Sequence, residues 1–452
     1  MNKTACILTI LLLLLASSCG ILPTESSDLA DIAPAPLLPL PTDTEVPAPS
    51  AEPTPPATDA TDPTSMPEPP EPEPEWLAPV IDAATVDKTG IGVIYVETLC
   101  YSSYAIQCDG SLWAWGYNNR SQLGDGTTTN RLSPVKILDD IIAISAGCDY
   151  AMAISEDGSL WAWGVNEDYQ LGDGTTESRL SPVEVLDDVV SVSAGCSHTL
   201  AIKTDGSLWN WGHTGLGQLV YAPTTKKKVA IIIPTKAMDD VVSVSAGWTH
   251  TVVIKADGSL WAWGDNSSCQ IGDDLTEKVY DPIREAYAPV RTPKKIMDDV
   301  ASVSAGGAYT MAVKTDGSLW AWGDNFDGQL GDGTTEDRHT PVKIMDDVVS
   351  VSAGGVHTMA IRTDGSLWGW GANYDGEIGD GTIENRYYPK KIMVDVRTVS
   401  VGIDYTMAIR TDNTLWAWGN NNYGQLGNGT SEKHYYPQKI MGSTITNEIG
   451  DG

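Results

Sequence analysis

The sequence predicts an all-β protein: a seven-bladed β-propeller of four-stranded antiparallel blades, preceded by a disordered stalk. One phrase, DGSLWAWG, recurs with small changes at intervals of 48, 48, 52, 59, 48 and 48 residues. Each interval also holds several short runs rich in Val, Ile and Trp that are separated by turn residues. A period of this length with strand-like runs is typical of repeat architectures that close into rings. The seven copies begin at Asp109, Asp157, Asp205, Asp257, Asp316, Asp364 and Asp412.

The amino terminus has the pattern of a secretion signal. Lys3 is followed by the apolar run CILTILLLLL and then by Ala-Ser-Ser-Cys, which ends at Cys19. A basic start, a short apolar stretch and small residues before a cleavage point are typical of signal peptides. Because a cysteine directly follows the small residues, the segment resembles the lipobox of bacterial lipoproteins, with residues 1–18 removed and Cys19 lipidated. The alternative is an ordinary signal peptide with an incidental cysteine.

Residues 19–75 are predicted to form a lipid-anchored linker. Pro, Ala, Thr, Ser, Asp and Glu dominate it, and from Gly20 to Asp87 there are 14 acidic residues and no Lys or Arg. Such a segment buries too little apolar surface to fold, and its prolines and like charges keep it extended. We expect it to hold the propeller, residues 76–452, away from a membrane that the lipid alone contacts. This predicts an extracytoplasmic location in the bacterial cell envelope; which membrane carries the anchor stays open.

The unit that begins at Pro341 shows how a blade is built. It reads PVKIM, VVSVSAG, GVHTMAI and SLWGWG, with turn residues between the runs. Alternate side chains of a strand point to opposite faces, so both Trp of each WxW share one face while Leu and Ala share the other. Each sheet then needs cover on both sides, which stacked blades provide. We expect the paired Trp to be core, so Trp320→Ala should cost about 3–5 kcal/mol and replacement of Trp248, outside the WxW pattern, much less.

A family resemblance follows from these residues. The stretch SAGGVHTMAIRTDGSLWGWGANYDGEIGDGT is similar to the repeat of the regulator of chromosome condensation family, and the resemblance covers roughly residues 76–441 and implies a seven-bladed propeller. The third copy departs most, because it lacks the GDG segment. The run APVID at residues 78–82 resembles SPVKILDD, which leaves open whether an amino-terminal strand closes the ring and which blade it would complete.

The resemblance also bears on function. The family's best-known activity is nucleotide exchange on the small GTPase Ran, together with chromatin binding, and a secreted, lipid-anchored chain has access to neither. The family's secreted bacterial propellers, which resemble an inhibitor of β-lactamases, imply protein binding on one face of the ring. Likeness of fold does not transfer function by itself.

The charge balance excludes nucleic acid as a partner. The chain carries a formal net charge of −32, and residues 88–452 alone hold 46 acidic and 27 basic residues. Binding to phosphates needs a basic patch, which this sequence does not show. An acidic body favours cationic partners instead.

The histidines do not form a recognisable catalytic or metal site. His198, His250 and His357 each lie seven residues before the turn Asp of their copy, where other copies have Tyr or Ser. This regularity favours a structural position. Because the sequence has no GxSxG, HExxH, P-loop or paired CxxC, we expect no catalysis, no cofactor and no metal. An enzyme whose site is assembled across blades is a remote alternative.

Three cysteines occupy one repeat position. Cys100, Cys148 and Cys196 each lie nine residues before the turn Asp in successive copies, so they should line adjacent blades near the axis. Buried thiols, one disulfide and a metal site all remain open, because a disulfide needs Cα atoms within about 7 Å.

The connections of up-and-down strands sort onto two ends of the ring. The DD and TDG turns, with 18 Asp, fall on one end, and the SAGxxH and NxxxQLGDGT loops fall on the other. Both insertions belong to the second end and bring a rare basic run there, so we predict that this end binds the partner. The alternative is that the insertions are tolerated loops and the aromatic residues plug the channel. The predicted partner-binding residues are Tyr150, His198, Trp248, His250, Tyr309, His357, Tyr405, Lys226, Lys227 and Lys228.

Together these observations predict a lipid-anchored, non-catalytic and monomeric scaffold that binds an extracytoplasmic protein of unknown identity. The alternative is a structural or adhesive envelope protein whose Asp-rich end binds Ca²⁺ or a basic polymer. Turn chemistry explains many of these Asp equally well, since Asp accepts hydrogen bonds from its own turn and tolerates unusual dihedrals.

Overall fold

The structure is a computed structural model that describes residues 92–220, 230–273, 280–281, 286–287 and 289–441. Several predicted features lie outside the described residues: the signal peptide, Cys19, the linker, the run at 78–82 and the three lysines at 226–228. In the part of the chain that is described, no helix is long and apolar enough to cross a membrane.

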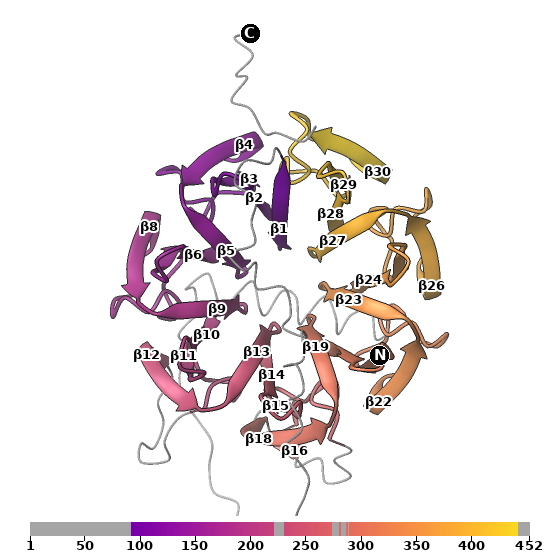
Figure 1. Ribbon diagram of the computed structural model, residues 1–452, viewed down its shortest axis with the longest axis horizontal. Helices are drawn as coiled ribbons and strands as arrows, with labels where there is room; N and C mark the ends of the chain where they lie inside the picture. Colours follow the sequence, from indigo (N-terminus) through magenta and orange to yellow (C-terminus); the bar gives the residue numbers. More distant parts are fainter. Residues whose placement is uncertain (1–91, 221–229, 274–279, 282–285, 288, 442–452) are drawn as a thin grey trace, which may run out of the picture. The chain divides into compact units, whose positions relative to one another are not determined.

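Seven four-stranded antiparallel sheets surround a central axis (Figure 1), which confirms the predicted fold class. We number the sheets blade 1 to blade 7 in chain order. Blade 1 consists of β1 (Val93–Leu99), β2 (Ser102–Gln107), β3 (Leu112–Gly116) and β4 (Arg131–Leu138). Blade 2 consists of β5 (Ile141–Ala146), β6 (Tyr150–Ser155), β7 (Leu160–Gly164) and β8 (Arg179–Leu186). Blade 3 consists of β9 (Val189–Ala194), β10 (His198–Lys203), β11 (Leu208–His213) and β12 (Ala230–Met238).

Blades 4 to 7 follow the same plan. Blade 4 consists of β13 (Val241–Ala246), β14 (His250–Lys255), β15 (Leu260–Gly264) and β18 (Val290–Met297), and blade 5 of β19 (Val300–Ala305), β20 (Tyr309–Lys314), β21 (Leu319–Gly323) and β22 (Arg338–Met345). Blade 6 consists of β23 (Val348–Ala353), β24 (His357–Arg362), β25 (Leu367–Gly371) and β26 (Arg386–Met393). Blade 7 consists of β27 (Val396–Val401), β28 (Tyr405–Arg410), β29 (Leu415–Gly419) and β30 (His434–Met441). A short pair, β16 (Tyr280–Asp281) and β17 (Ala286–Tyr287), stands within the insertion of blade 4.

The blade begins one strand later than the unit drawn from the sequence. The PVKIM run at Pro341 lies in β22, the outermost strand of blade 5, where it pairs with β21. The innermost strand of blade 6 is the VVSVSA run, β23. Each blade is therefore built from consecutive strands, and blade 7 takes its fourth strand from β30. An amino-terminal strand is not needed to complete any of the seven blades.

The two Trp of each WxW differ in burial. The second Trp is fully buried in all seven blades, and its Nε1 donates to a backbone carbonyl in the preceding blade, as Trp322 does to Gln270 (3.0 Å). The first Trp, except Trp113, is only partly buried; Trp320 donates to the Ser318 hydroxyl of its own turn (2.9 Å). The predicted core role therefore belongs to Trp322, and truncation of Trp320 removes less buried surface.

The ring closes through side chains that reach from blade to blade. Ser145 accepts the backbone N–H of Ala194 in the next blade (3.0 Å), and five further serines repeat this contact around the axis. The last of them, Ser400, accepts the N–H of Thr98 (2.9 Å) and so joins blade 7 to blade 1. Closure therefore uses the same serine bond as five of the other contacts between blades, each of which satisfies a backbone donor.

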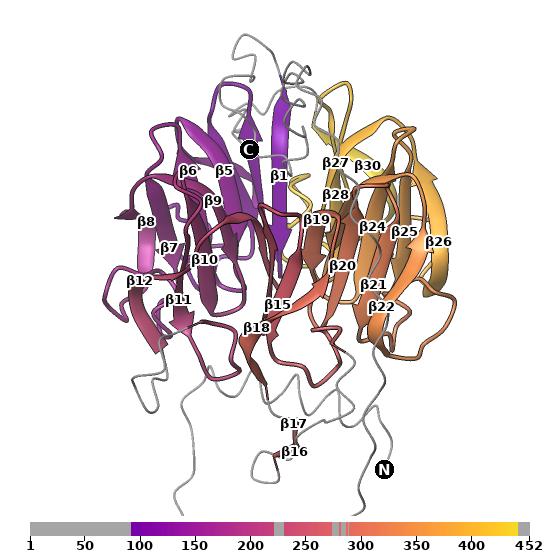
Figure 2. The same ribbon diagram turned by 60° about the horizontal axis from the view of Figure 1, so that its bottom comes forward.

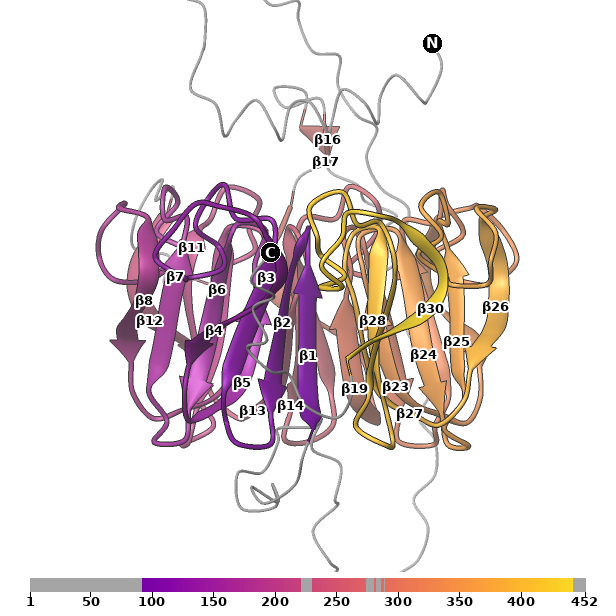
Figure 3. The same ribbon diagram turned by 90° about the horizontal axis from the view of Figure 1, so that it is seen from above.

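The strands run between two ends of the ring, as Figure 3 shows from the side. At one end the second residue of each DD turn, such as Asp140, has a positive φ (57°), which Asp tolerates better than most residues. At the same end Asp205 accepts the N–H and hydroxyl of Ser207 (2.9 and 2.5 Å), and the hydroxyl bond lowers its pKa. The Asp of the DD turns and the Asp of the TDG turns therefore both stabilise the turns in which they lie. Among the described residues, no three His, Cys, Asp or Glu are arranged to hold a metal ion.

Candidate functional site

The other end of the ring, which we call the loop face, carries two kinds of connection. The inner loops join the first and second strands of each blade, and the outer loops join the third and fourth strands. The short pair β16–β17 projects from this face (Figures 2 and 3). The loop face is the end that the sequence predicts to bind a partner.

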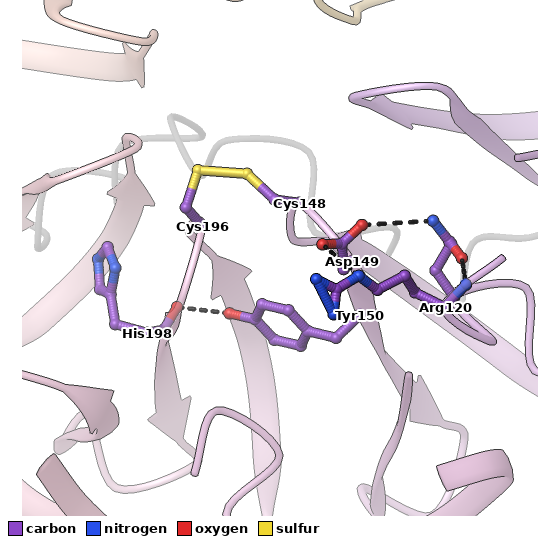
Figure 4. The surroundings of a disulfide bond; sticks show 7 residues. Arg120, Cys148, Asp149, Tyr150, Cys196 and His198 are labelled. Carbon is purple, nitrogen blue, oxygen red and sulfur yellow. Dashed lines mark hydrogen bonds and ion pairs between the residues drawn. A yellow bond between two sulfur atoms is a disulfide. The ribbon is translucent and has the colours of Figure 1, made fainter. Parts of the chain in front are cut away.

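Seven equivalent residues of the inner loops surround the axis. Cys148 and Cys196 form a disulfide between blades 2 and 3, with Cα atoms 4.6 Å apart (Figure 4). Cys100, the third cysteine of this ring, is outside that disulfide, and burial raises the pKa of its thiol. Of the alternatives that the sequence left open, the structure therefore contains one disulfide. The seven positions are Cys100, Cys148, Cys196, Trp248, Gly307, Gly355 and Ile403.

Trp248 lies over the glycines of this ring. A Cβ atom on Gly307 or on Gly355 would lie 3.3 Å from the indole of Trp248, although the two glycines belong to blades 5 and 6 and Trp248 to blade 4. The indole therefore lies across the inner loops of neighbouring blades while remaining partly exposed. Of the seven aromatic residues predicted to contact a partner, Trp248 is the one that the described structure leaves partly open to solvent.

The other six predicted aromatic residues join blades to one another. All six are fully buried. The Tyr150 hydroxyl donates to the His198 carbonyl (2.6 Å, Figure 4), and the His250 Nε2 pairs with Thr310 Oγ1 in the next blade (3.0 Å). Burial lowers the pKa of His198 and of His250 to about 3, so both imidazoles are neutral at physiological pH. In this structure a partner could reach none of the six directly; they are Tyr150, His198, His250, Tyr309, His357 and Tyr405.

A channel of about 480 Å³ runs along the axis and is lined by the innermost strands. Small and β-branched residues, mainly Val and Ser, form most of its wall, whereas blade 1 contributes the larger Tyr95 and Glu97. The Tyr95 hydroxyl donates to Glu97 (3.2 Å), and burial raises the pKa of Glu97 to about 7. Glu97 also accepts the backbone N–H of Ala146, so it completes the ring that six serines form elsewhere.

The outer loops are held by their own side chains. Asn118 is fully buried; its Oδ1 accepts the Leu123 N–H (3.0 Å) and its Nδ2 donates to Asp125 (3.0 Å). Asp125 also pairs with Arg131 at the start of the next strand (2.6 Å). The same Asn recurs in five further blades, and its Oδ1 accepts the equivalent backbone N–H in each. Each loop therefore holds its remaining, variable residues on a fixed frame.

The variable residues meet where one blade contacts the next, a place we call a seam and number by its blades. At each seam we pair, by their equivalent positions in the repeat, the fifth residue after the WxW motif with the inner-loop residue that precedes the second strand of the following blade. Arg120 and Asp149 at seam 1/2 are an ion pair (3.6 Å, Figure 4). From seam 1/2 to seam 7/1 the pairs are Arg120 with Asp149, Asp168 with Ser197, Leu216 with Thr249, Ser268 with Ala308, Asp327 with Val356, Asp375 with Asp404, and Tyr423 with Tyr101.

Seam 6/7 gathers three carboxyl groups. Asp375 and Asp404 are hydrogen-bonded to each other and share the amide of Asn420, which donates to Asp375 (2.5 Å) and to Asp404 (3.2 Å). Burial, and then the charge of Asp375, raise the pKa of Asp404 to about 7. Glu377, only 1% exposed, adds a third carboxyl whose pKa burial also raises to about 7. Lys433 forms an ion pair with Asp375 at the edge of this group.

Three tyrosines form a cluster at the adjoining seam 7/1. The ring of Tyr423 lies 5.2 Å from that of Tyr101 and 4.8 Å from that of Tyr117. All three are partly exposed on the loop face. Burial, and then the charge of Asp404, raise the pKa of Tyr101.

The sequence reasoning missed this group, although a signal for it was present. Glu377 replaces a Gln that the other six copies retain, and Asp375 occupies the position of Arg120. Both stand out only when each copy is compared position by position, whereas the sequence reasoning searched for aromatic residues and insertions. The three predicted lysines at 226–228 lie outside the described residues, so the structure does not place them.

The chain matches family models over most of its length. The RCC1-like domain model matches residues 135–451, and the model of the regulator of chromosome condensation (RCC1) repeat matches residues 109–154. The chain belongs to the RCC1-like domain family. This membership confirms the resemblance drawn from the repeated motifs.

Curated RCC1-like relatives match only in part. The ultraviolet-B receptor UVR8 of Arabidopsis thaliana is 37% identical over 98 residues, which are 21% of this chain and 20% of that protein. The probable E3 ubiquitin-protein ligase HERC3 of Homo sapiens is 34% identical over 117 residues, which are 25% of this chain and 11% of that protein. The matched segments therefore span a fifth or less of either relative.

Solved RCC1-like structures share the fold. Human WBSCR16 has a TM-score of 0.64 at 22% identity and covers 73% of this chain and 94% of its own. Prp20p of Saccharomyces cerevisiae has a TM-score of 0.62 at 19% identity and covers 78% of this chain and 88% of its own. At these identities the likeness establishes the propeller alone.

Proposed function

We propose that this RCC1-like propeller is a non-catalytic scaffold that binds a protein on its loop face, outside the cytoplasm. Prp20p has binding properties to Gsp1p and histones, which supports protein binding as a use of this fold. HERC3 is a probable ubiquitin-protein ligase, but its match with this chain covers only 11% of it. Protein binding is therefore the coarser use that we carry over from the relatives.

The observation that carries the proposal is where the seven copies differ. Residues that bond one blade to the next, such as the buried Trp and the serines around the axis, recur in almost every copy. The seam pairs, by contrast, are charged, polar, apolar or aromatic from seam to seam and are mostly partly exposed. Variation confined to one face of a fixed frame is what a surface for a specific partner requires.

Photo-crosslinking from both faces would test the choice of face. A photoreactive amino acid at the exposed Asn119 of the loop face should capture an envelope protein, whereas the same group at the exposed Glu156 of the turn end should not. Trp248→Ala should weaken the capture from Asn119, because Trp248 is a partly exposed aromatic residue of the inner loops on this face. Capture from Glu156 alone would move the binding surface to the turn end.

The lipid anchor is part of the same proposal and rests on the sequence around Cys19. Cys19→Ser should abolish the incorporation of a labelled fatty acid and leave the propeller folded, because the blades are complete without residues 1–91. Equal label on the wild type and on Cys19→Ser would end the lipoprotein interpretation.

A further inference from the structure

We propose that seam 6/7 binds a cationic side chain of the partner, an arginine guanidinium or a lysine ammonium. The proposal rests on the proposed function, because it names the chemistry that a partner would present to the loop face. The site consists of the partly exposed Asp375 and Asp404, with the buried Glu377 and the tyrosine cluster of seam 7/1 nearby.

The carboxyl groups of seam 6/7 outnumber the cations that pair with them. At seam 1/2 Arg120 pairs with Asp149 (3.6 Å) and also with Glu167 (3.6 Å), so the aspartate of this seam has a cation from the paired position. At the same two positions seam 6/7 has Asp375 and Asp404, the only seam pair with two like charges. Glu377 adds a third carboxyl, against a single ammonium from Lys433. A second cation is what this group lacks.

The second step is independent of the charge count and concerns buried acceptors. The Oδ1 of Asp404 is buried and has no hydrogen-bond partner in the described part of the chain. Glu377 is 99% buried, and its carboxylate accepts only backbone N–H groups, from Asp375 (2.7 Å) and from itself. A buried acceptor without a donor is costly, and a guanidinium or an ammonium supplies several donors at once.

Comparison with other blades shows which donor is missing near Asp404. In blade 5 the equivalent Gln329 donates its amide to Asp324 (2.6 Å), and in blade 7 Gln425 donates to Asn420 (3.1 Å). Blade 6 has Ala372 at the position of Asp324 and a Glu in place of the Gln. The loop of blade 6 therefore lacks the amide donor that the other six copies have, and it also lacks the acceptor found in blades 5 and 7.

The third step is the aromatic cluster. The rings of Tyr101 and Tyr423 are 5.2 Å apart at the adjoining seam and are partly exposed. A cation over an aromatic face gains about 0.5–1 kcal/mol at exposed sites. An Arg or Lys side chain suits this site better than a bare metal ion, because carboxylates accept its N–H groups and aromatic rings pack against its apolar stem. Among the described residues, no three His, Cys, Asp or Glu are arranged to hold a metal ion.

Lys433 already shows that the site accepts an ammonium. Its Nζ pairs with Asp375, while its side chain remains 33% exposed. It engages one of the three carboxyl groups from the rim and leaves Glu377 and Asp404 without a cation. A partner's side chain would therefore add to this contact or displace it.

The test uses a short probe and a matched pair of charge reversals. The probe is acetyl-Gly-Arg-Gly amide, compared with the same peptide carrying uncharged citrulline, titrated into the full chain by ligand-observed NMR at pH 8 and low salt. Asp375→Arg recreates the charge pair of seam 1/2 and should weaken the arginine peptide by roughly tenfold, the value of one charged hydrogen bond. Asp168→Arg makes the same change at the equivalent position of seam 2/3, where the paired position is the uncharged Ser197, and should change the affinity less than about twofold.

A second variant guards against misfolding. Glu377→Gln restores the residue of the other six copies, so it should fold and still weaken the arginine peptide. Equal affinity of the wild type for the arginine and citrulline peptides would overturn the proposal, as would equal losses in Asp375→Arg and Asp168→Arg. If either of these results is obtained while crosslinking from the loop face persists, the arginine site is ruled out and the proposed function stands. If the protein binds the arginine peptide but crosslinks form only from the turn end, the proposed function is ruled out instead.

Discussion

Seams 1/2 and 6/7 share the hydrogen bond that joins their two blades, but the charges of the side chains at the two seams differ. Trp163 donates to the Gln122 carbonyl (2.8 Å), and at the other seam Trp418 donates to the Glu377 carbonyl (2.8 Å). Above this shared bond, seam 1/2 joins an arginine to an aspartate, whereas seam 6/7 joins two aspartates.

The difference shows that the groups that hold the blades together are separate from the groups that the seams display. The backbone carbonyl of the Gln position accepts the Trp N–H whichever side chain that position carries. Changes in the displayed side chains therefore leave the bond between blades intact. A repeated frame of this kind can acquire a distinct site at one seam without a new fold.

The largest expected effect tests whether the frame is really shared. Trp163→Ala and Trp418→Ala should each lower the free energy of unfolding by about 3–5 kcal/mol, because each removes a fully buried aromatic residue and its hydrogen bond. Chemical denaturation of both variants measures this. Unequal losses at the two seams would show that the acidic seam has a different frame.

The same titration separates the two Trp of a motif. Trp320→Ala should cost clearly less than Trp322→Ala, because Trp320 is partly exposed and Trp322 is fully buried. Equal costs would restore the prediction from the sequence, which treated both Trp of the pair as core.

The second effect concerns the buried acid of seam 6/7. Glu377→Gln should stabilise the protein at pH 8 by about 2–3 kcal/mol and change little at pH 5. The pKa of Glu377 is raised to about 7 in the folded state from an ordinary 4.5. The folded state therefore binds the proton more tightly, and stability is lost as the pH rises from 4.5 to about 7. Gln removes that loss, and thermal unfolding at both pH values measures it.

The reverse change in a neighbouring blade is the control. Gln329→Glu should destabilise the protein at pH 8, because Gln329 donates to Asp324 (2.6 Å) and a carboxylate there would face another carboxylate. A pH-independent gain from Glu377→Gln would mean that Glu377 is not a buried acid in the folded protein.

The sequence predicted the frame well because the frame repeats. Seven copies of one motif, with apolar runs that alternate with turn residues, were enough to predict seven antiparallel blades. The blade boundary was misplaced by one strand, because a repeat has no natural first strand in the sequence. Pairing with β21, which assigns Pro341 to blade 5, depends on contacts that periodicity does not reveal.

The site was harder to predict, for two physical reasons. The aromatic residues that the sequence singled out, such as Tyr309, are large and polar, but their polar atoms bond the next blade, as Tyr309 does to the His357 carbonyl (2.6 Å). Residue type alone does not distinguish such a link from an exposed anchor. In addition, Asp375 and Asp404 are 29 residues apart in the sequence and become neighbours only through the seam.

The smallest expected effect is the coupling energy between the two residues of each seam pair. Its sign at the two seams tests their comparison most directly. A double-mutant cycle of Arg120→Ala and Asp149→Ala should give an attractive coupling of about 0.2–1 kcal/mol, the range of partly exposed ion pairs. The cycle of Asp375→Ala and Asp404→Ala at pH 8 should give a coupling of similar size and opposite sign. At pH 5 the second coupling should lose its repulsive sign, because Asp404, with a pKa of about 7, is then protonated and donates to Asp375. Two couplings of the same sign at pH 8 would mean that the seams do not differ in the way their charges imply.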